Sequence, residues 1–325
     1  MVRITLCRFY VLAVTAGIVP GASTITVPVA GYAVESSGPE LRAIYGVPGS
    51  YRFSDPFPLP DGVTRIHMAP GQDFALVERG NAGLGILFLS GGTVDRVAAV
   101  DGALAAVDWV AFSPAAGSVV LFSSSANRMQ VLSGLPDAPR VTMDLDASTL
   151  PELPLTGAVS DDGQVLLVAS SQALYLLPPN GAAQLLLSAG KIVSVVMLRN
   201  GTDAAVSERS TGSVHIMQGI GSAPVDRLLA SGLAGIGKLY PSSDGKAIFV
   251  ARPGAKAMSS IDLASGDIRS FDSDVAPVML YPLRNRDTFL ISARPQQPGW
   301  IFFRDGDAGH VVFIPGAQAA AKELK

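Results

Sequence analysis

Arg65, His67 and Asp108 are the residues whose side chains could support catalysis in this sequence. A carboxylate and an imidazole can exchange protons with a substrate, and a guanidinium can stabilise negative charge that develops during a reaction. All three lie on or near predicted first strands of a repeated unit, where we expect them to face a central channel. Convergence there would favour a hydrolase. Ordinary structural hydrogen bonding is the alternative reading of each side chain.

Four arginines recur at nearly the same place in the repeat and could recognise anions. Arg79, Arg209, Arg252 and Arg294 fall at the predicted far ends of second strands, on one face of a disc. The aspartates of the turns gather on the opposite face: Asp73, Asp162, Asp203, Asp244 and Asp287. Three further arginines, Arg199, Arg284 and Arg286, fall on this acidic side and weaken the pattern. The sequence thus suggests a basic face for anionic partners, with solvated strand ends as the alternative.

The sequence predicts neither a metal site nor a cofactor. Its three histidines, His67, His215 and His310, fall on first, third and fourth strands of different units, so we do not expect them to meet around a metal. Residues 232–238 match the spacing of a phosphate-binding loop. However, Leu239 stands where such a loop needs Ser or Thr to bind magnesium.

The first 23 residues have the pattern of a signal peptide. Arg3 and Arg8 precede a short apolar run, and Gly21 and Ser23 are small residues suited to a cleavage site. An uncleaved amphipathic anchor is the alternative. Cleavage would remove Cys7, the only cysteine, so we expect an exported mature chain without thiol chemistry or disulfides.

These candidate residues are carried by a repeat. A turn followed by a short apolar run recurs six times between residues 70 and 292, with a period of about 43 residues. Each unit divides into four short segments of strand character; in the first unit these are 63–69, 73–79, 84–89 and 93–100. Strands 119–122 and 165–168 are apolar without alternation, which predicts burial of both faces. The turn glycines are expected to supply the positive φ of the hairpins.

A period in the low forties with several strands in each unit is typical of β-propeller blades. Three more strands, at 31–35, 41–46 and 50–53, precede the six units and suggest a seventh blade. Its closing strand is missing or comes from elsewhere in the chain. We therefore predict an all-β propeller of four-stranded antiparallel blades, with seven blades favoured over six.

Two of the turns carry a family resemblance. Residues 160–164 and 241–246, with a partial match at 112–114, resemble the turn-and-strand unit of bacterial secreted propellers with YVTN-type, TolB-type or WD40-like repeats. The resemblance covers residues 31–315 and implies a propeller, but no single function. Propellers of this kind include scaffolds, binding modules and lactonases.

We expect three regions: a signal peptide at 1–23, one propeller domain at 24–316 and a flexible tail at 317–325. A net charge of −3 argues against a nucleic-acid partner, and no membrane span is predicted beyond the signal peptide. The leading hypothesis is a monomeric, secreted or periplasmic, non-catalytic module that binds a protein or glycan of the cell envelope. The alternative is a lactonase-like hydrolase whose site lies at the channel.

Overall fold

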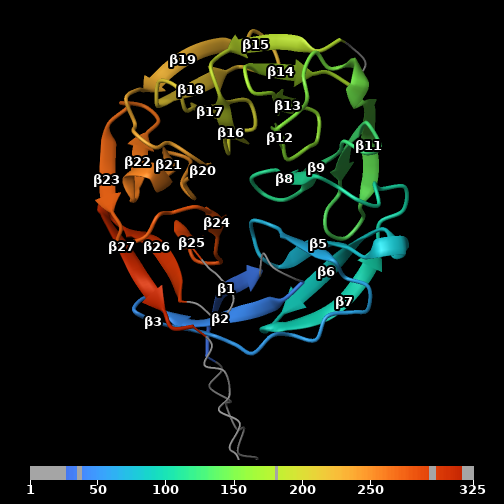
Figure 1. Cartoon of the computed structure of the whole chain (residues 1–325), viewed down its shortest axis with the longest axis vertical. Helices are drawn as coiled ribbons and strands as arrows, with labels where there is room; N and C mark the ends of the chain where they lie inside the picture. The colour runs from blue at the N-terminus through green and yellow to red at the C-terminus, as the bar shows by residue number, and fades with distance from the viewer. Residues whose placement is uncertain (1–26, 35–38, 180–181, 293–297, 317–325) are drawn as a thin grey trace, which may run out of the picture.

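The computed structural model describes residues 27–34, 39–179, 182–292 and 298–316. These residues form seven antiparallel sheets arranged as the blades of a ring (Figure 1). Blades 1 to 7 follow one another in chain order, so the predicted all-β propeller with seven blades is confirmed.

The first strand of every blade lies nearest the centre of the ring (Figure 1). These inner strands are β1 (Val29–Val34), β4 (Arg65–Met68), β8 (Trp109–Phe112), β12 (Thr156–Val159), β16 (Ile192–Met197), β20 (Leu239–Pro241) and β24 (Tyr281–Pro282). We call the side where the inner strands begin the entry face. The opposite side, where hairpins join the inner strands to the second strands, is the hairpin face.

The second strands lie deepest in the blades. They are β2 (Leu41–Val47), β5 (Phe74–Glu78), β9 (Ser118–Ser123), β13 (Leu166–Ala169), β17 (Ala204–Glu208), β21 (Ala247–Arg252) and β25 (Thr288–Ser292). Every residue of β5, β9, β13 and β17 is buried. The prediction of two buried faces is therefore confirmed.

The reason for this double burial is the packing between blades. The described residues form seven apolar clusters, one between each pair of neighbouring blades. Because a second strand points alternate side chains into the clusters on its two sides, each side chain leaves water. Seven such clusters hold the ring together without any disulfide.

The third and fourth strands complete the blades toward the rim. The third strands are β3 (Ser50–Phe53), β6 (Leu84–Ser90), β10 (Arg128–Ser133), β14 (Ala173–Leu177), β18 (Ser213–Gln218), β22 (Ala257–Asp262) and β26 (Gly299–Asp305). The fourth strands are β7 (Thr93–Ala99), β11 (Arg140–Asp146), β15 (Gln184–Ser188), β19 (Val225–Ala230), β23 (Ile268–Asp272) and β27 (Ala308–Ile314). Three short 3₁₀ turns, η1 (Gly80–Ala82), η2 (Ala147–Thr149) and η3 (Pro253–Ala255), are the only helical elements among the described residues. None of the helical segments in the described ranges could cross a membrane.

Blade 1 has three strands, β1–β2–β3, and no fourth strand is found for it among the described residues. Blade 7 takes all four of its strands from the end of the described chain, so the two ends of the described chain share no blade. The ring closes instead through the packing of blade 1 on blade 7 and through polar contacts on the hairpin face. There, the backbone N–H of Arg284 donates to the carbonyl of Ala30 at 2.9 Å.

The hairpin turns follow the predicted positions with one correction. In blades 4, 5 and 6 the turn glycine has a positive φ, as expected; Gly163, for example, has φ 73°. In blades 2 and 3 the left-handed residue is not the predicted glycine but its neighbour, Gln72 or Ala116. Gln72 is held there by buried hydrogen bonds, which offset the cost of that backbone conformation.

Candidate functional site

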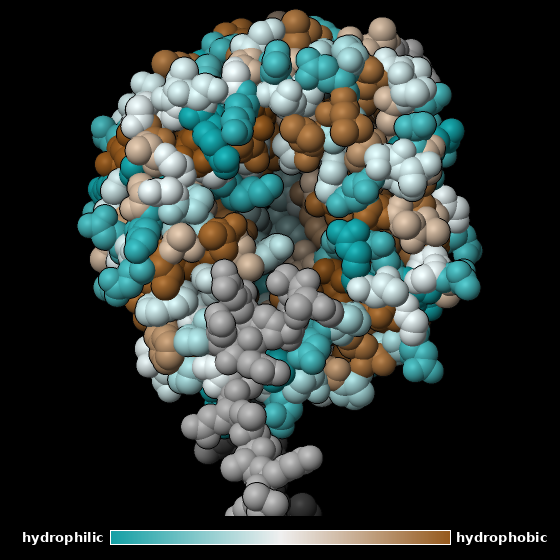
Figure 2. Space-filling model, in the orientation of Figure 1, coloured by the Kyte–Doolittle hydropathy of each residue, from teal (hydrophilic) through white to brown (hydrophobic). Residues whose placement is uncertain are grey.

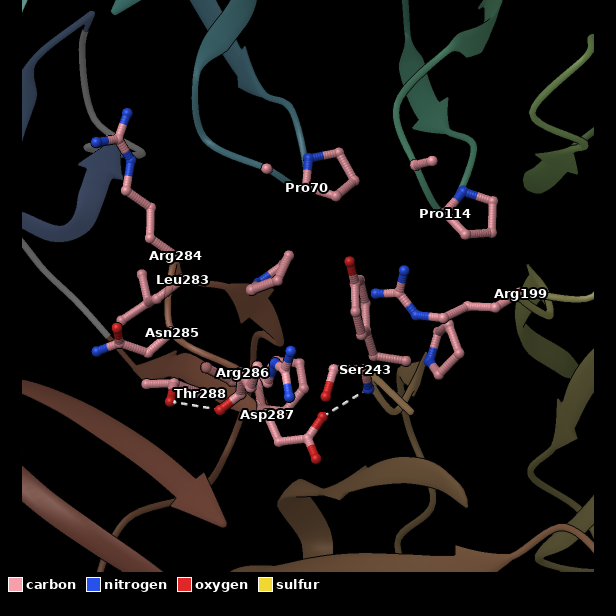
Figure 3. Close-up of a pocket in the computed structure, with 16 residues that line it drawn as sticks. Pro70, Pro114, Arg199, Ser243, Leu283, Arg284, Asn285, Arg286, Asp287 and Thr288 are labelled. Carbon is pink, nitrogen blue, oxygen red and sulfur yellow. Dashed lines mark hydrogen bonds between the residues drawn. The ribbon is translucent and has the colours of Figure 1, made fainter. Parts of the chain in front are cut away.

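The hairpin turns of five blades surround a pocket at the centre of the hairpin face, with a volume of about 280 Å³. We call it the mouth pocket. Its walls include Pro70 and Pro114 on one side and the segment from Pro282 to Phe289 on the other, as Figure 3 shows. The pocket therefore lies where the channel opens between the inner strands. On the side of the molecule shown in Figure 2, the centre of the ring is also hollow.

Three arginines line the mouth pocket, and they differ in how far they are already bonded. Arg284 is committed: it donates to the carbonyl of Gln72 at 3.1 Å and to Asp73 at 2.9 Å, and it lies over the Tyr32 ring. Arg199 donates only through Nε, to the carbonyl of Ser242 at 3.0 Å. Its two Nη groups make no hydrogen bond within the described ranges.

Arg286 is the third of these arginines, and it is exposed. Its backbone carbonyl accepts the Thr288 hydroxyl at 3.0 Å, but its side chain makes no hydrogen bond or ion pair with any described residue. Arg199 and Arg286 therefore bring guanidinium groups to the pocket that keep unused donors.

The aspartates around the mouth pocket are occupied by other partners. Asp287 accepts the backbone N–H of Ser243 at 2.7 Å, the contact drawn in Figure 3, and pairs with Arg304. Asp161 accepts the backbone N–H of Ala115 at 2.7 Å. The two bonds from backbone N–H groups each join one blade to the next, whereas the pair with Arg304 lies within blade 7, so these carboxylates brace the rim of the pocket.

Tyr240 also lines the mouth pocket, on inner strand β20. Its ring packs edge-on against Phe289, with 5.3 Å between centroids. Burial raises the pKa of the Tyr240 phenol to about 12, while the nearby charge of Arg199 opposes the rise. The phenol is therefore neutral at any physiological pH and provides a flat, largely apolar wall.

A second cluster lies at the entry face, between blades 2 and 3. His67 Nε2 lies 2.9 Å from Glu78 Oε1, and Arg65 Nη1 lies 3.1 Å from the same oxygen. The side chain of Glu78 is 7% exposed, whereas those of His67 and Arg65 are 16% and 47% exposed. Arg65 also donates to the carbonyl of Val107, which ties the cluster to blade 3.

Of the three predicted channel residues, the structure brings Arg65 and His67 together on Glu78. Asp108 makes no hydrogen bond to this group among the described residues and bonds to Ser124 instead. Asp108 accepts the backbone N–H of Ser124 at 2.5 Å. Hydrogen bonds from Ser124 lower the pKa of Asp108, and the charge of Arg65 adds to the effect. The sequence reading missed Glu78; its only sequence signal was an acid at the end of an otherwise apolar strand.

The arginines of the predicted basic face lie where the repeat placed them, as far as the structure describes them. Arg79, Arg209 and Arg252 are at or just past the ends of second strands, on the entry face. Arg252 is bonded to its own blade through the Ala234 carbonyl and two serine hydroxyls, whereas Arg209 is exposed. Arg294 lies outside the described residues.

The histidines lie on the strands expected for them and are separated by the fold. His67 is on β4, His215 on β18 and His310 on β27. His215 Nδ1 lies 3.0 Å from Asp226 Oδ1, and His310 stacks on Phe303. Within the described ranges, no group of three or more potential metal ligands is found.

Solved structures of very different sequence share this architecture. A putative 6-phosphogluconolactonase from Bacteroides fragilis is 13% identical, with a TM-score of 0.57 over 88% of this chain and 92% of that one. A functionally unknown protein from Desulfotomaculum acetoxidans is 15% identical, with a TM-score of 0.58 over 88% and 99%. Hydrazine synthase from Kuenenia stuttgartiensis is 12% identical, with a TM-score of 0.50 over 91% and 99%.

The likeness is one of fold. At these identities it establishes a β-propeller and carries no activity from one chain to another. No protein-family model matches the sequence. No curated protein matches it either.

Proposed function

We propose that this chain is an exported, non-catalytic binding module of the cell envelope and that its ligand or partner enters the mouth pocket. The observation that carries the proposal is the pocket itself, built from the turns of five blades at the open end of the channel. Turns on a rigid scaffold are common binding sites because the scaffold fixes their positions. The pattern of the first 23 residues supports export, and the net negative charge argues against a nucleic-acid partner.

The rim of the pocket is fixed before any ligand arrives. Ala115 and Ser243 donate backbone N–H groups to aspartates of the next blade, and the Gln72 amide bridges to the Pro282 carbonyl at 2.7 Å. Binding to such a rim costs little additional ordering, so most of the contact energy is available for affinity. This organisation distinguishes the mouth pocket from a loose surface groove.

The experiment is capture of partners from native envelope extract by the tagged chain 24–325, with identification by mass spectrometry. Ala115→Trp should fill the pocket, because Ala115 lines it and is exposed. Ala264→Trp is the matched control: Ala264 is an exposed turn alanine on another blade whose N–H also donates to an aspartate. A partner lost with Ala115→Trp and kept with Ala264→Trp supports the proposal. A partner retained equally by both variants contradicts it.

The cluster at the entry face supports a second candidate, a hydrolase that needs no metal. The observation in its favour is that Glu78 contacts both His67 and Arg65 through one oxygen. Glu78 would orient the imidazole as a general base, and Arg65, the more exposed of the two, would stabilise a developing oxyanion. The putative lactonase among the structural neighbours makes lactones a reasonable first substrate class.

A panel of lactones and activated esters tests this candidate. Hydrolysis that disappears in both His67→Ala and Glu78→Gln, with folding retained, would establish it. Hydrolysis that survives both substitutions would exclude this cluster as its source.

A further inference from the structure

We infer that the mouth pocket selects a small organic oxyanion, held by Arg199 and Arg286, whose compact body lies against Tyr240 and the proline walls. The inference rests on the proposed function, because it names the chemistry of the ligand expected in that same pocket.

The first argument is the balance of charge at the pocket. Of the lining residues, Arg199, Arg284 and Arg286 are basic and Asp287 is acidic. Asp287 is paired with Arg304, which comes from outer strand β26 and lies outside the pocket lining. The acid therefore brings no unpaired negative charge to the cavity.

The acids just outside the lining are also occupied. Asp73 is paired with Arg284, and Asp161 accepts the Ala115 N–H. Asp244 accepts the Ser242 hydroxyl and the Lys246 N–H, and Asp203 accepts the Asn200 side-chain amide and the Gly219 N–H. Hydrogen bonding leaves these carboxylates charged but engages their oxygen atoms, whereas the guanidinium groups of Arg199 and Arg286 bring cationic donors without described partners to the pocket.

The second argument is the geometry of the two available guanidinium groups. Arg199 reaches the pocket from blade 5 and Arg286 from blade 7, and Figure 3 shows the Arg199 side chain directed toward the middle of the cavity. A guanidinium presents a planar fork of N–H donors that matches a carboxylate or phosphate. Two forks from different blades can grip one oxyanion from two sides, which water or a neutral hydroxyl would satisfy less well.

The third argument is the rest of the wall. Tyr240 keeps its phenol protonated and offers a ring face, and Pro70, Pro114 and Pro241 contribute apolar rings. These surfaces suit the CH groups of a sugar or another compact ring and leave the charged end to the arginines. A cavity of about 280 Å³ limits the bound body to about one such ring.

The experiment uses three probes that share one sugar ring and differ in charge: glucuronate, glucose 1-phosphate and neutral glucose. Inorganic phosphate serves as an anion that lacks the ring. Affinities for the chain 24–325 come from titration calorimetry or ligand-observed NMR at millimolar concentrations. We expect one or both ring anions to bind, and glucose to bind at least about tenfold more weakly, as expected for the loss of charge-assisted hydrogen bonds. Which of the two anions binds more tightly identifies carboxylate or phosphate as the preferred group.

Arg199→Gln and Arg286→Gln should each lower the affinity for the bound anion by about tenfold or more, and Ala115→Trp should abolish its binding. Arg128→Gln is the control, because Arg128 pairs with Asp144 on the outer strands and lies outside the pocket. Unchanged melting temperatures would show that the variants fold.

Failures of the inference and of the proposed function can be told apart. Glucose binding as tightly as the anions, or anion binding unaffected by both arginine substitutions, overturns the oxyanion inference while pocket binding still stands if Ala115→Trp abolishes it. Absence of binding by all the anionic probes also overturns the inference. If the Ala115→Trp variant captures the same partner from envelope extract as the wild type does, the proposed function itself is overturned.

Discussion

The Oε1 atom of Gln72 accepts the backbone N–H of Tyr32 at 2.6 Å. Gln72 lies in the first hairpin turn of blade 2 and Tyr32 in the inner strand of blade 1, and both are buried. The amide nitrogen of Gln72 donates at 2.7 Å to the carbonyl of Pro282 in blade 7. One side chain thus joins blade 2 to both blades at the closure of the ring, where blades 1 and 7 share none of the described strands.

Gln72→Ala should lower the free energy of unfolding by about 1–3 kcal/mol, because it leaves buried backbone groups of Tyr32 and Pro282 without partners. Glutamine and alanine are both disfavoured in the left-handed conformation of position 72. The difference in stability therefore reports mainly on the lost hydrogen bonds. Gln164→Ala is the control: Gln164 occupies the equivalent turn of blade 4, is exposed and makes no side-chain hydrogen bond to a described residue. Denaturant unfolding measures both. Equal stability of the two variants would show that Gln72 does not brace the ring.

The turns of blades 4 and 6 share a serine–aspartate cap that should make stability sensitive to acid. Ser160 donates to Asp162 at 2.5 Å and Ser242 to Asp244 at 2.6 Å, and these bonds are the main cause of the lowered pKa of each carboxyl. A carboxyl whose pKa is lower in the folded state stabilises the fold above its ordinary pKa of 3.8. That contribution is lost as the pH falls below this value toward the folded-state pKa.

The Asp162→Asn, Asp244→Asn double variant should therefore be less stable at neutral pH and should lose less stability on acidification than the wild type. Denaturant unfolding between neutral pH and pH 3 provides the comparison. Parallel stability curves for the two proteins would contradict the proposed role of the caps.

Tyr240 should make the fold sensitive to alkali. Its phenol has a pKa of about 12 in the folded protein, above the ordinary value of 10.0, so its contribution to stability is complete below pH 10 and is lost as the pH rises toward 12. Tyr240→Phe should flatten the decline of stability between these pH values and remove one late-titrating phenol from the ultraviolet titration. Loss of a phenol that titrates near pH 10 instead would contradict the burial of this phenol.

Glu78 should support the entry-face cluster whether or not that cluster is catalytic. Glu78→Ala should lower the free energy of unfolding by about 2 kcal/mol, because Arg65 and His67 lose the carboxylate that they share. Glu152→Ala, at an exposed loop position, should have little effect. A loss no larger than that of the control would mean that the cluster contributes nothing to holding blades 2 and 3 together.

The sequence predicted the blades well because each blade is built from strands that are consecutive in the chain. A turn, an apolar run and two further strands fall within one repeat, so the strand boundaries follow from hydrophobic pattern and turn residues. The strands of the first unit illustrate this: the predicted segment 93–100 is observed as Thr93–Ala99. The same local pattern misplaced the left-handed residue in two turns, because Gln72 owes its conformation to contacts with other blades.

The candidate sites were less accessible from the sequence because they depend on which turns meet at the axis. By strand polarity alone, Arg199 and Arg286 fall on the acidic side of the disc and weaken the prediction of a basic face. The structure brings them to one pocket, since five hairpins converge at the centre. Glu78 was overlooked because its partners, Arg65 and His67, lie on the neighbouring strand in a register that only the pairing of β4 with β5 defines.

The most direct test of binding at the mouth pocket is site-specific photo-crosslinking in native envelope extract. A small aliphatic residue that carries a diazirine, placed at Ala115, would stand at the pocket without filling it as Trp does, and the same residue at Ala264 would stand on an exposed turn of blade 6 away from the pocket. We predict a discrete adduct from position 115 that competing oxyanion suppresses, and none from position 264. Adducts of equal yield from both positions, or an adduct only from position 264, would contradict binding at the mouth pocket.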